Sequence, residues 1–306
     1  MLHVFIINSF AGSGDFADSL REKLSTEADI NYLVFNSEYP GDEGVLAREI
    51  YELFEEETIR FYACGGSGTF RNIVKGLPDH ERAEFAEIPY GASNDFLMAF
   101  GKVKDRFLNI DDMIKGRVVM IDYMKSNMGP ACNSVSTGFD VQMIKTASHV
   151  SDSLFSGGPS SYVIGGIRAL FKKCWFDAEI CADGIRMKGR YDIFLAVNGN
   201  RVGSMCHVGS GGSPFDGRIE VLLLPHRNFF GRMMSLIALT GNNQKYIDRH
   251  SVRLKASHIR IDFKDMDNVE CNFDGELDSG EYLEVEVVPR GLRFVIPSGM
   301  EVDYEN

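Results

Sequence analysis

The residues best suited to chemistry form a glycine-rich segment, Gly65-Gly66-Ser67-Gly68-Thr69. This segment follows an apolar, strand-like run over residues 58–64 and precedes a helix-like run over 70–77. A glycine-rich turn at a helix N-terminus presents backbone N–H groups and the positive end of the helix dipole, which together suit a phosphate. Such turns also occur simply because they let a helix pack close to a sheet, so the segment alone leaves both interpretations open.

Two further segments carry polar residues at the start of an expected helix. The run from Asn8 to Gly14 is a second glycine-rich turn, which is either another phosphate contact or a flexible first loop. A turn and a helix are predicted over 91–100, and Asn94 and Asp95 lie in the first turn of that helix. Asn and Asp are also ordinary capping residues at that position, so the pair has a structural interpretation as well.

Aspartate is followed by glycine at three places, Asp183, Asp216 and Asp274, and the last of these pairs precedes Glu276. An Asp-Gly pair is most often a tight turn between two strands. Asp183 fits that interpretation, because strand-like runs flank it on both sides. The dipeptide pattern does not distinguish a turn aspartate from a catalytic or metal-binding one.

The elements that must position these residues change character near residue 122. Before it, apolar strands over 4–7, 30–35, 58–64 and 85–90 alternate with helices whose apolar faces carry Phe16, Leu20 and Leu24, then Leu46, Ile50 and Leu53. Strands of this kind predict a parallel sheet covered by helices on both faces. Ligands of such sheets bind at the carboxyl ends of the strands, where both glycine-rich loops would lie.

Residues 123–290 are rich in β-branched and aromatic strand-like runs, and two helices are predicted at 160–173 and 228–239. The strand-like runs cover 117–124, 131–135, 175–182, 185–197, 219–224, 251–263, 269–273 and 282–288. We therefore predict an α/β N-terminal domain over 1–122 and a C-terminal antiparallel β-sandwich domain with inserted helices over 123–290. The tail over 291–306 is expected to pack back on the first domain.

Composition excludes several classes of protein. The chain of 306 residues has a formal net charge of -12, which argues against nucleic-acid binding and against purely electrostatic adsorption to an anionic membrane. The six cysteines form no Cys-x-x-Cys pair and the seven histidines show no metal or triad spacing, so no zinc site is expected. Without a signal peptide or an apolar stretch of about 18 residues, we expect a cytoplasmic protein, at most peripheral at the inner face of the membrane.

Taken in order, the motifs resemble those of the diacylglycerol kinase catalytic-domain family, the bacterial soluble lipid kinases related to sphingosine kinases and more distantly to NAD kinases. The resemblance extends over essentially the whole chain. Its motifs are Asn8 with the glycines after it, Gly-Gly-x-Gly-Thr at 65–69, Pro-x-Gly-x-x-Asn-Asp-Phe at 89–96, Ile121-Asp122, Gly138-Phe139-Asp140, Asn198-Gly199, Asp216-Gly217 and Asp274-Gly275-Glu276.

The resemblance implies an ATP- and Mg²⁺-dependent kinase that transfers the γ-phosphate to a lipid alcohol such as diacylglycerol. The first domain would bind the nucleotide, and residues 123–290 would carry the lipid and catalytic side. Asp274 would be the base that accepts the proton of the lipid hydroxyl. Asp216, with backbone groups near Ser213 and Arg218, would hold a structural magnesium, and Asp122 lies at another magnesium-linked position. ATP would contact Asn8, Asn36, Gly65, Gly66, Ser67, Gly68, Thr69, Gly91, Ala92, Asn94, Asp95 and Glu276.

The chain departs from the family pattern in the nucleotide loops. The family has Asp where this chain has Ser67, Asn-Glu at Arg71-Asn72, and Thr at Ala92, while Ser9 replaces a proline. A serine hydroxyl can donate a hydrogen bond but cannot hold a cation as a carboxylate does. Two alternatives follow, a weak or inactive member that binds nucleotide or lipid, and an NAD kinase-like small-molecule kinase. The lipid and the oligomeric state, a homodimer included, stay open.

Overall fold

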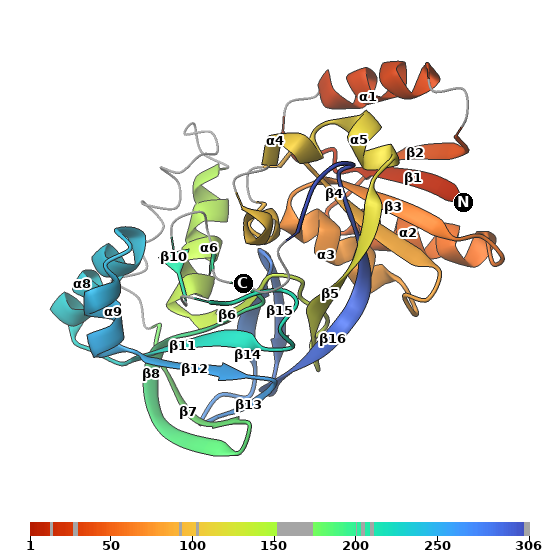
Figure 1. Cartoon of the computed structure of the whole chain (residues 1–306). Helices are drawn as coiled ribbons and strands as arrows, with labels where there is room; N and C mark the ends of the chain where they lie inside the picture. The colour runs from red at the N-terminus through yellow and green to blue at the C-terminus, as the bar shows by residue number, and fades with distance from the viewer. Residues whose placement is uncertain are drawn as a thin grey trace. The chain divides into compact units, whose positions relative to one another are not determined.

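The computed structural model describes residues 1–12, 15–26, 30–91, 94–101, 104–151, 174–199, 201–202, 206–208 and 211–302. The chain divides into two compact units (Figure 1). Unit 1 comprises Met1–Tyr123 and Pro289–Asn306, and unit 2 comprises Met124–Val288. Two strands, β5 (Arg117–Ser126) and β16 (Tyr282–Ile296), continue from one unit into the other. The strand predicted over 282–288 is therefore too short, because buried apolar residues extend it to Ile296.

Unit 1 is built on a parallel sheet, as the apolar strands predict. Its strands are β1 (Leu2–Ile7), β2 (Tyr32–Asn36), β3 (Ile59–Gly65) and β4 (Ala83–Pro89), in the order β2-β1-β3-β4, and the end of β16 pairs with β4. Every residue of β1, β3 and β4 is buried. Strands without an exposed face need helices on both sides of the sheet, which agrees with the predicted α/β class.

The helices of unit 1 are α1 (Asp15–Ser25), α2 (Asp42–Leu53), α3 (Ser67–Gly76), α4 (Lys104–Phe107), α5 (Ile110–Ile114) and a short 3-10 helix, η1 (Phe96–Phe100). One prediction about these helices is wrong. Leu53 is 75% exposed, because α2 buries Ala47, Ile50 and Tyr51 instead. The turn and helix predicted over 91–100 contain η1, whose N-cap residue is Asp95, without a capping hydrogen bond from its side chain.

Unit 2 is an antiparallel β structure, which confirms the predicted class. Its main ladder runs β15-β14-β6-β8-β7-β13-β16, while β11 pairs with β8 and β12. These strands are β6 (Ser134–Gly138), β7 (Phe176–Ala182), β8 (Ile185–Val197), β11 (Ile219–Pro225), β12 (Val252–Ala256), β13 (His258–Phe263), β14 (Val269–Phe273) and β15 (Glu276–Gly280), beside a small pair, β9 (Arg201–Val202) and β10 (Cys206–His207). The strand predicted over 251–263 is two strands, divided at Ser257.

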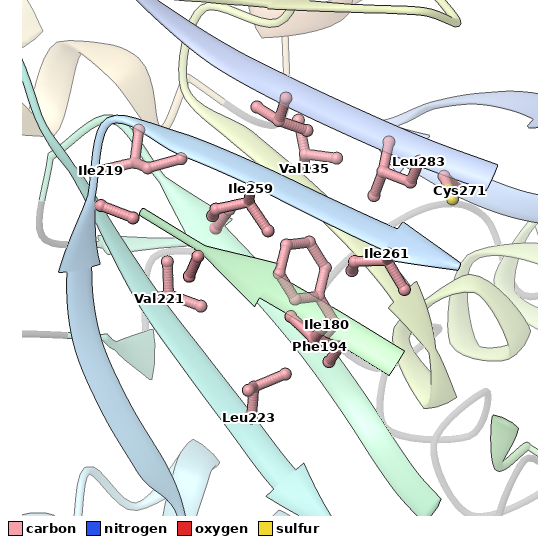
Figure 2. Packing of buried hydrophobic residues seen from close by; sticks show 14 of the residues in the cluster. Val135, Ile180, Phe194, Ile219, Val221, Leu223, Ile259, Ile261, Cys271 and Leu283 are labelled. Atoms are coloured by element: carbon pink, nitrogen blue, oxygen red, sulfur yellow. The ribbon is translucent and has the colours of Figure 1, made fainter. Parts of the chain in front are cut away.

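Two apolar clusters stabilise unit 2. The larger lies between strands and includes Phe194, Ile259 and Leu283, all fully buried (Figure 2). The smaller packs the helices α6 (Phe139–Ser151), α8 (Phe229–Thr240) and α9 (Gln244–His250) against β8 and β11. The helix predicted over 228–239 is α8, capped by the Asn228 side chain, whereas the helix predicted over 160–173 lies outside the described residues.

Candidate functional site

The carboxyl edge of the unit 1 sheet brings together residues that lie far apart in the sequence. Asn8 follows β1, Asn36 ends β2, Gly65 ends β3 and Gly91 follows β4. The register places Ile7 opposite both Asn36 and Cys64, so these strand ends lie at one level. This edge is where a parallel sheet with helical crossovers binds ligands.

The glycine-rich segment forms the start of α3. Gly66 is the N-cap residue and has no side chain that could cap the helix. The N–H groups of the first helical turn have no partner within the helix, which makes such a turn suited to a phosphate. Asn8 Nδ2 donates to Thr69 Oγ1 over 2.9 Å, which fixes the end of β1 against this turn. A Cβ at Gly65 would approach Thr69 Oγ1 to 2.3 Å, so this position requires glycine.

The second loop packs directly on the first. Gly91 N donates to Gly65 O over 2.8 Å, and a Cβ at Gly91 would lie 2.7 Å from Gly66 N. Asn94 Nδ2 donates to Gly91 O over 2.8 Å and so holds this loop in shape. Asp95 is buried beside it, and Ala92 lies outside the described residues.

Two polar atoms near these loops are buried without a hydrogen-bond partner among the described residues. They are Ser67 Oγ and Asn94 Oδ1, on side chains that are 4% and 6% exposed. Burial of an unpaired hydroxyl or amide oxygen costs about 1–3 kcal/mol. A polar ligand at the start of α3 would remove that cost, so the loops fit a phosphate-bearing molecule.

Sequence reasoning missed a cation at this edge and the role of the residues after the glycine loop. Arg21 Nη2 donates to Asn36 Oδ1 over 2.8 Å, but the sequence drew attention only to the apolar face of α1. Arg71 is 2% exposed inside α3. Asn72 Nδ2 donates to Glu43 Oε2 over 3.2 Å and ties α3 to α2. The substituted pair therefore belongs to the packing of α3.

In unit 2, Asp274 occupies the tight turn between β14 and β15. Asp274 and Gly275 have φ angles of +54° and +102°, and the Asp274 side chain is buried. Its Oδ2 accepts the N–H of Cys132 (2.6 Å), and its Oδ1 accepts those of Asn133 (3.0 Å) and Ser134 (2.7 Å). Three N–H donors fix the direction of this carboxylate.

A polar network supports this turn. Asn198 donates from Nδ2 to Cys132 O over 2.9 Å and from its backbone N–H to Asn133 O over 2.7 Å. Asn272 Nδ2 contacts Ser136 Oγ and Asp140 Oδ2, and Asn272 Oδ1 accepts the N–H of Gly275 over 2.8 Å. The sequence motifs contain Asp140 and Asn198 but not Ser136 or Asn272, which only the β14–β6 pairing brings together. Glu276 is exposed at the start of β15.

The predicted magnesium residues lie in two separate environments. Asp122 is fully buried in β5, and its Oδ1 accepts the N–H of Arg290 over 2.8 Å. Asp216 lies in the loop before β11, where its Oδ1 accepts the N–H of Arg218 over 3.0 Å and its N–H points to Ser213 O at 3.5 Å. Among the described residues, no group of three or more His, Cys, Asp and Glu side chains is arranged to hold a metal.

A lysine occupies the free side of Asp216. Lys255 Nζ lies 3.2 Å from Asp216 Oδ2, 3.2 Å from Glu220 Oε1 and 2.9 Å from Gly211 O. Burial lowers the pKa of Lys255, but its hydrogen bonds to the two carboxylates outweigh burial and raise that pKa above its ordinary value. One carboxylate expected to hold a metal, that of Asp216, therefore contacts an ammonium group instead.

The α8 helix exposes an apolar stripe on unit 2. Phe230, Met234 and Ile237, spaced four and three residues apart, are 70%, 44% and 55% exposed. Residues 226–250 carry four Arg and Lys residues but a single carboxylate, Asp248, in a chain with a net charge of -12. The described part of the chain contains no helix long and apolar enough to cross a membrane.

Comparison with known proteins gives two adjoining matches. Residues 3–126 match the family model of the diacylglycerol kinase catalytic domain, and residues 133–296 match that of the YegS C-terminal NAD kinase beta sandwich-like domain. A Shewanella frigidimarina protein named "Probable lipid kinase YegS-like" is 25% identical over 261 residues, which are 82% of this chain and 81% of that protein. A Staphylococcus carnosus protein named "Diacylglycerol kinase" is 26% identical over 226 residues, 72% of this chain and 71% of that protein.

Other matches are shorter or concern the fold alone. YtlR of Bacillus subtilis is 29% identical over 154 residues, so the match covers 47% of this chain and only 50% of that protein. A crystal structure described as a diacylglycerol kinase from Bacillus anthracis has a TM-score of 0.67 and 18% identity, and covers 98% of both chains. The fold of this chain, an α/β unit followed by an antiparallel β unit, is therefore similar to that of this crystal structure.

Proposed function

The chain belongs to the family of diacylglycerol kinase-like lipid kinases, and from this premise we propose that it transfers the γ-phosphate of ATP to the hydroxyl of a lipid alcohol such as diacylglycerol. The observation that carries the proposal is the start of α3, where the N-cap glycine offers no side-chain cap, with the buried Ser67 hydroxyl beside it, for which the described residues supply no hydrogen-bond partner. A site of this kind suits the phosphates of a nucleotide.

The glycine-rich loops and Asp274 have defined parts in the proposal. The N–H groups at the start of α3 and the Ser67 hydroxyl bind phosphate oxygens, while Asn8 and Gly91 hold the two loops in place. Asp274, oriented by three N–H donors, would orient the lipid hydroxyl and accept its proton. Mg²⁺ would enter with ATP and offset the charge of the phosphates.

The test is ATP consumption and phosphorylated product formation with a panel of lipid alcohols, with NAD as a separate acceptor. We expect turnover with at least one lipid alcohol, none with NAD, and loss of ATP binding in Gly66→Val, because a side chain there blocks close approach of the phosphates. Phosphorylation of NAD alone, or unchanged ATP affinity in a folded Gly66→Val protein, would contradict the proposal.

The second candidate function is nucleotide or lipid binding without efficient catalysis, and Ser67 favours it. The buried Ser67 position lacks the carboxylate that the family pattern has there, and a hydroxyl offers less to a cation. If this substitution limits the enzyme, Ser67→Asp raises turnover or its Mg²⁺ dependence by about tenfold or more. A fully active parent protein with no gain in Ser67→Asp would exclude this candidate.

A lipid substrate requires access to a membrane, and we propose that the exposed stripe of α8 supplies it. Phe230, Met234 and Ile237 present apolar surface, and the surrounding cations suit an anionic lipid surface. The protein would then act in the cytoplasm as a peripheral enzyme at the inner face of the membrane. Because the chain as a whole is negatively charged, it is not attracted to an anionic membrane by its net charge, so we assign membrane binding to this local surface.

A further inference from the structure

The loop before β11 contains a cation site that this chain fills with its own side chain. Asp216 is the position to which the family resemblance assigns a structural magnesium, with backbone groups of Ser213 and Arg218. We propose that the Lys255 ammonium replaces that metal, so that the loop folds without magnesium. The inference concerns this structural cation alone and does not depend on turnover or on the magnesium that enters with ATP.

The ammonium has the contacts of a bound cation. A lysine ammonium has three N–H donors, and three oxygens surround Lys255 Nζ. They are Gly211 O at 2.9 Å, Asp216 Oδ2 at 3.2 Å and Glu220 Oε1 at 3.2 Å. Two of these oxygens come from the loop and one from β11, so the ammonium connects the loop to the sheet as a structural metal would.

The sheet determines where this lysine lies. In the antiparallel β11–β12 pair, Lys255 is directly opposite Glu220, and Glu220 is buried. Directly opposed side chains on one face of a sheet lie close enough for an ion pair. The position of the ammonium therefore follows from strand register, and the loop residues Gly211 and Asp216 close over it.

A magnesium ion does not fit beside this lysine. Magnesium requires about six oxygens at roughly 2.0–2.1 Å in octahedral geometry. Asp216 Oδ1 already accepts the N–H of Arg218 over 3.0 Å, and its Oδ2 is the oxygen that Lys255 contacts. A metal on Oδ2 would lie no more than about 5 Å from the ammonium, where two positive charges repel each other. Magnesium could bind only after Lys255 left.

The experiment compares thermal unfolding of the nucleotide-free protein in MgCl₂ and in EDTA. For the parent protein we expect melting temperatures that agree within about 1 °C. Lys255→Met leaves Asp216 and Glu220 as neighbouring, uncompensated carboxylates. We expect it to melt several degrees lower in EDTA, to recover at least about half of that loss in MgCl₂, and to gain a calorimetric binding isotherm for Mg²⁺.

Lys188→Met is the matched control, because Lys188 is also opposite a glutamate, Glu179, in an antiparallel pair of unit 2 and is exposed. It should gain no response to MgCl₂. If Lys255→Met does not fold, the Asp216→Asn variant tests the proposal. The proposal expects this variant to lose the same stability, relative to the parent, in MgCl₂ and in EDTA. A parent protein that MgCl₂ stabilises through Asp216, or a Lys255→Met protein with no loss and no response to Mg²⁺, would overturn the proposal.

Discussion

Two Asp-Gly pairs of unit 2 show how much the surroundings of a residue matter beyond its type. Asp183 and Asp274 both sit in two-residue turns, with φ angles of +45° and +54°. Asp183 is not merely a turn residue, since its carboxylate accepts the N–H groups of Ser257 and His258 and the Ser257 hydroxyl. These hydrogen bonds outweigh its partial burial and lower the pKa of Asp183. Exposure separates the two, because Asp183 is exposed and Asp274 is buried.

This similarity makes Asp183→Asn a matched control for Asp274→Asn. In each variant an NH₂ group replaces an oxygen that accepts an N–H, so each should lose about 1–3 kcal/mol of stability. If Asp274 accepts the proton of the lipid hydroxyl, turnover of Asp274→Asn should fall by about 10²–10⁴, with ATP affinity kept. Turnover of Asp183→Asn should stay close to that of the parent below its melting temperature.

The measurements are lipid phosphorylation, ATP affinity and a thermal melt of the two variants side by side. Equal losses of turnover in both would show that the effect is one of stability. An Asp274→Asn protein as active as the parent would remove Asp274 from the reaction.

At the scale of elements, the sequence predicted what depends on neighbours in the chain. The parallel strands, a helix next to the glycine-rich segment and the α8 helix follow from apolar periodicity and glycine placement, and the structure confirms them. The predicted start of α3 at residue 70 is wrong, because the helix already begins at Ser67. The apolar face of α2 was misplaced at Leu53, because the pattern does not say which side of a short helix meets the sheet. The two-domain class was likewise predictable from the change of pattern near residue 122.

The candidate site was less predictable, because its contacts come from distant segments. The N–H groups that donate to Asp274 belong to residues 132–134. The cation beside Asp216 is Lys255, which lies in β12. The family resemblance identified Asp216 and Asp274 but not what surrounds them. Strand register determines those neighbours, and it becomes known only with the fold.

The α8 helix carries a prediction about membranes. We expect the protein to sediment with vesicles containing anionic phosphatidylglycerol, and Phe230→Asp to weaken that binding by roughly tenfold or more, because it removes a large apolar contact and adds a negative charge. Salt at physiological strength should weaken the binding only a little, since apolar burial is not screened.

Ile185→Asp is the control, because Ile185 is 60% exposed in the same unit but lies at the start of β8, away from the α8 stripe. Its binding should match that of the parent. Equal losses in the two variants, or binding that collapses between low and physiological salt, would contradict a role for α8. Concentration-dependent light scattering of the parent that disappears in Phe230→Asp would instead indicate that a second copy covers the stripe.

For the whole molecule, a buried histidine in the core of unit 1 carries a prediction about stability in acid. His3 is 7% exposed in β1, its ring stacks on that of Tyr62, and its Nδ1 lies 2.8 Å from the Tyr62 hydroxyl. Burial first, and then the charge of Arg60, lower the pKa of His3 from 6.5 to about 4. Nδ1 of the neutral His3 ring can accept a hydrogen bond from the Tyr62 hydroxyl, whereas a protonated ring cannot.

The last prediction is that His3 makes folding sensitive to acid between these two pKa values. From about pH 6.5 down to about pH 4 the unfolded chain binds a proton at His3 and the folded chain does not, so stability falls as the pH falls and this loss levels off below about pH 4. At about pH 5 the loss from this group is about 2 kcal/mol. His3→Asn keeps an acceptor for Tyr62 but does not titrate, so urea unfolding should show a smaller loss from about pH 7 to about pH 5 than in the parent. If His3→Asn loses as much stability as the parent over this range, the acid sensitivity comes from other groups.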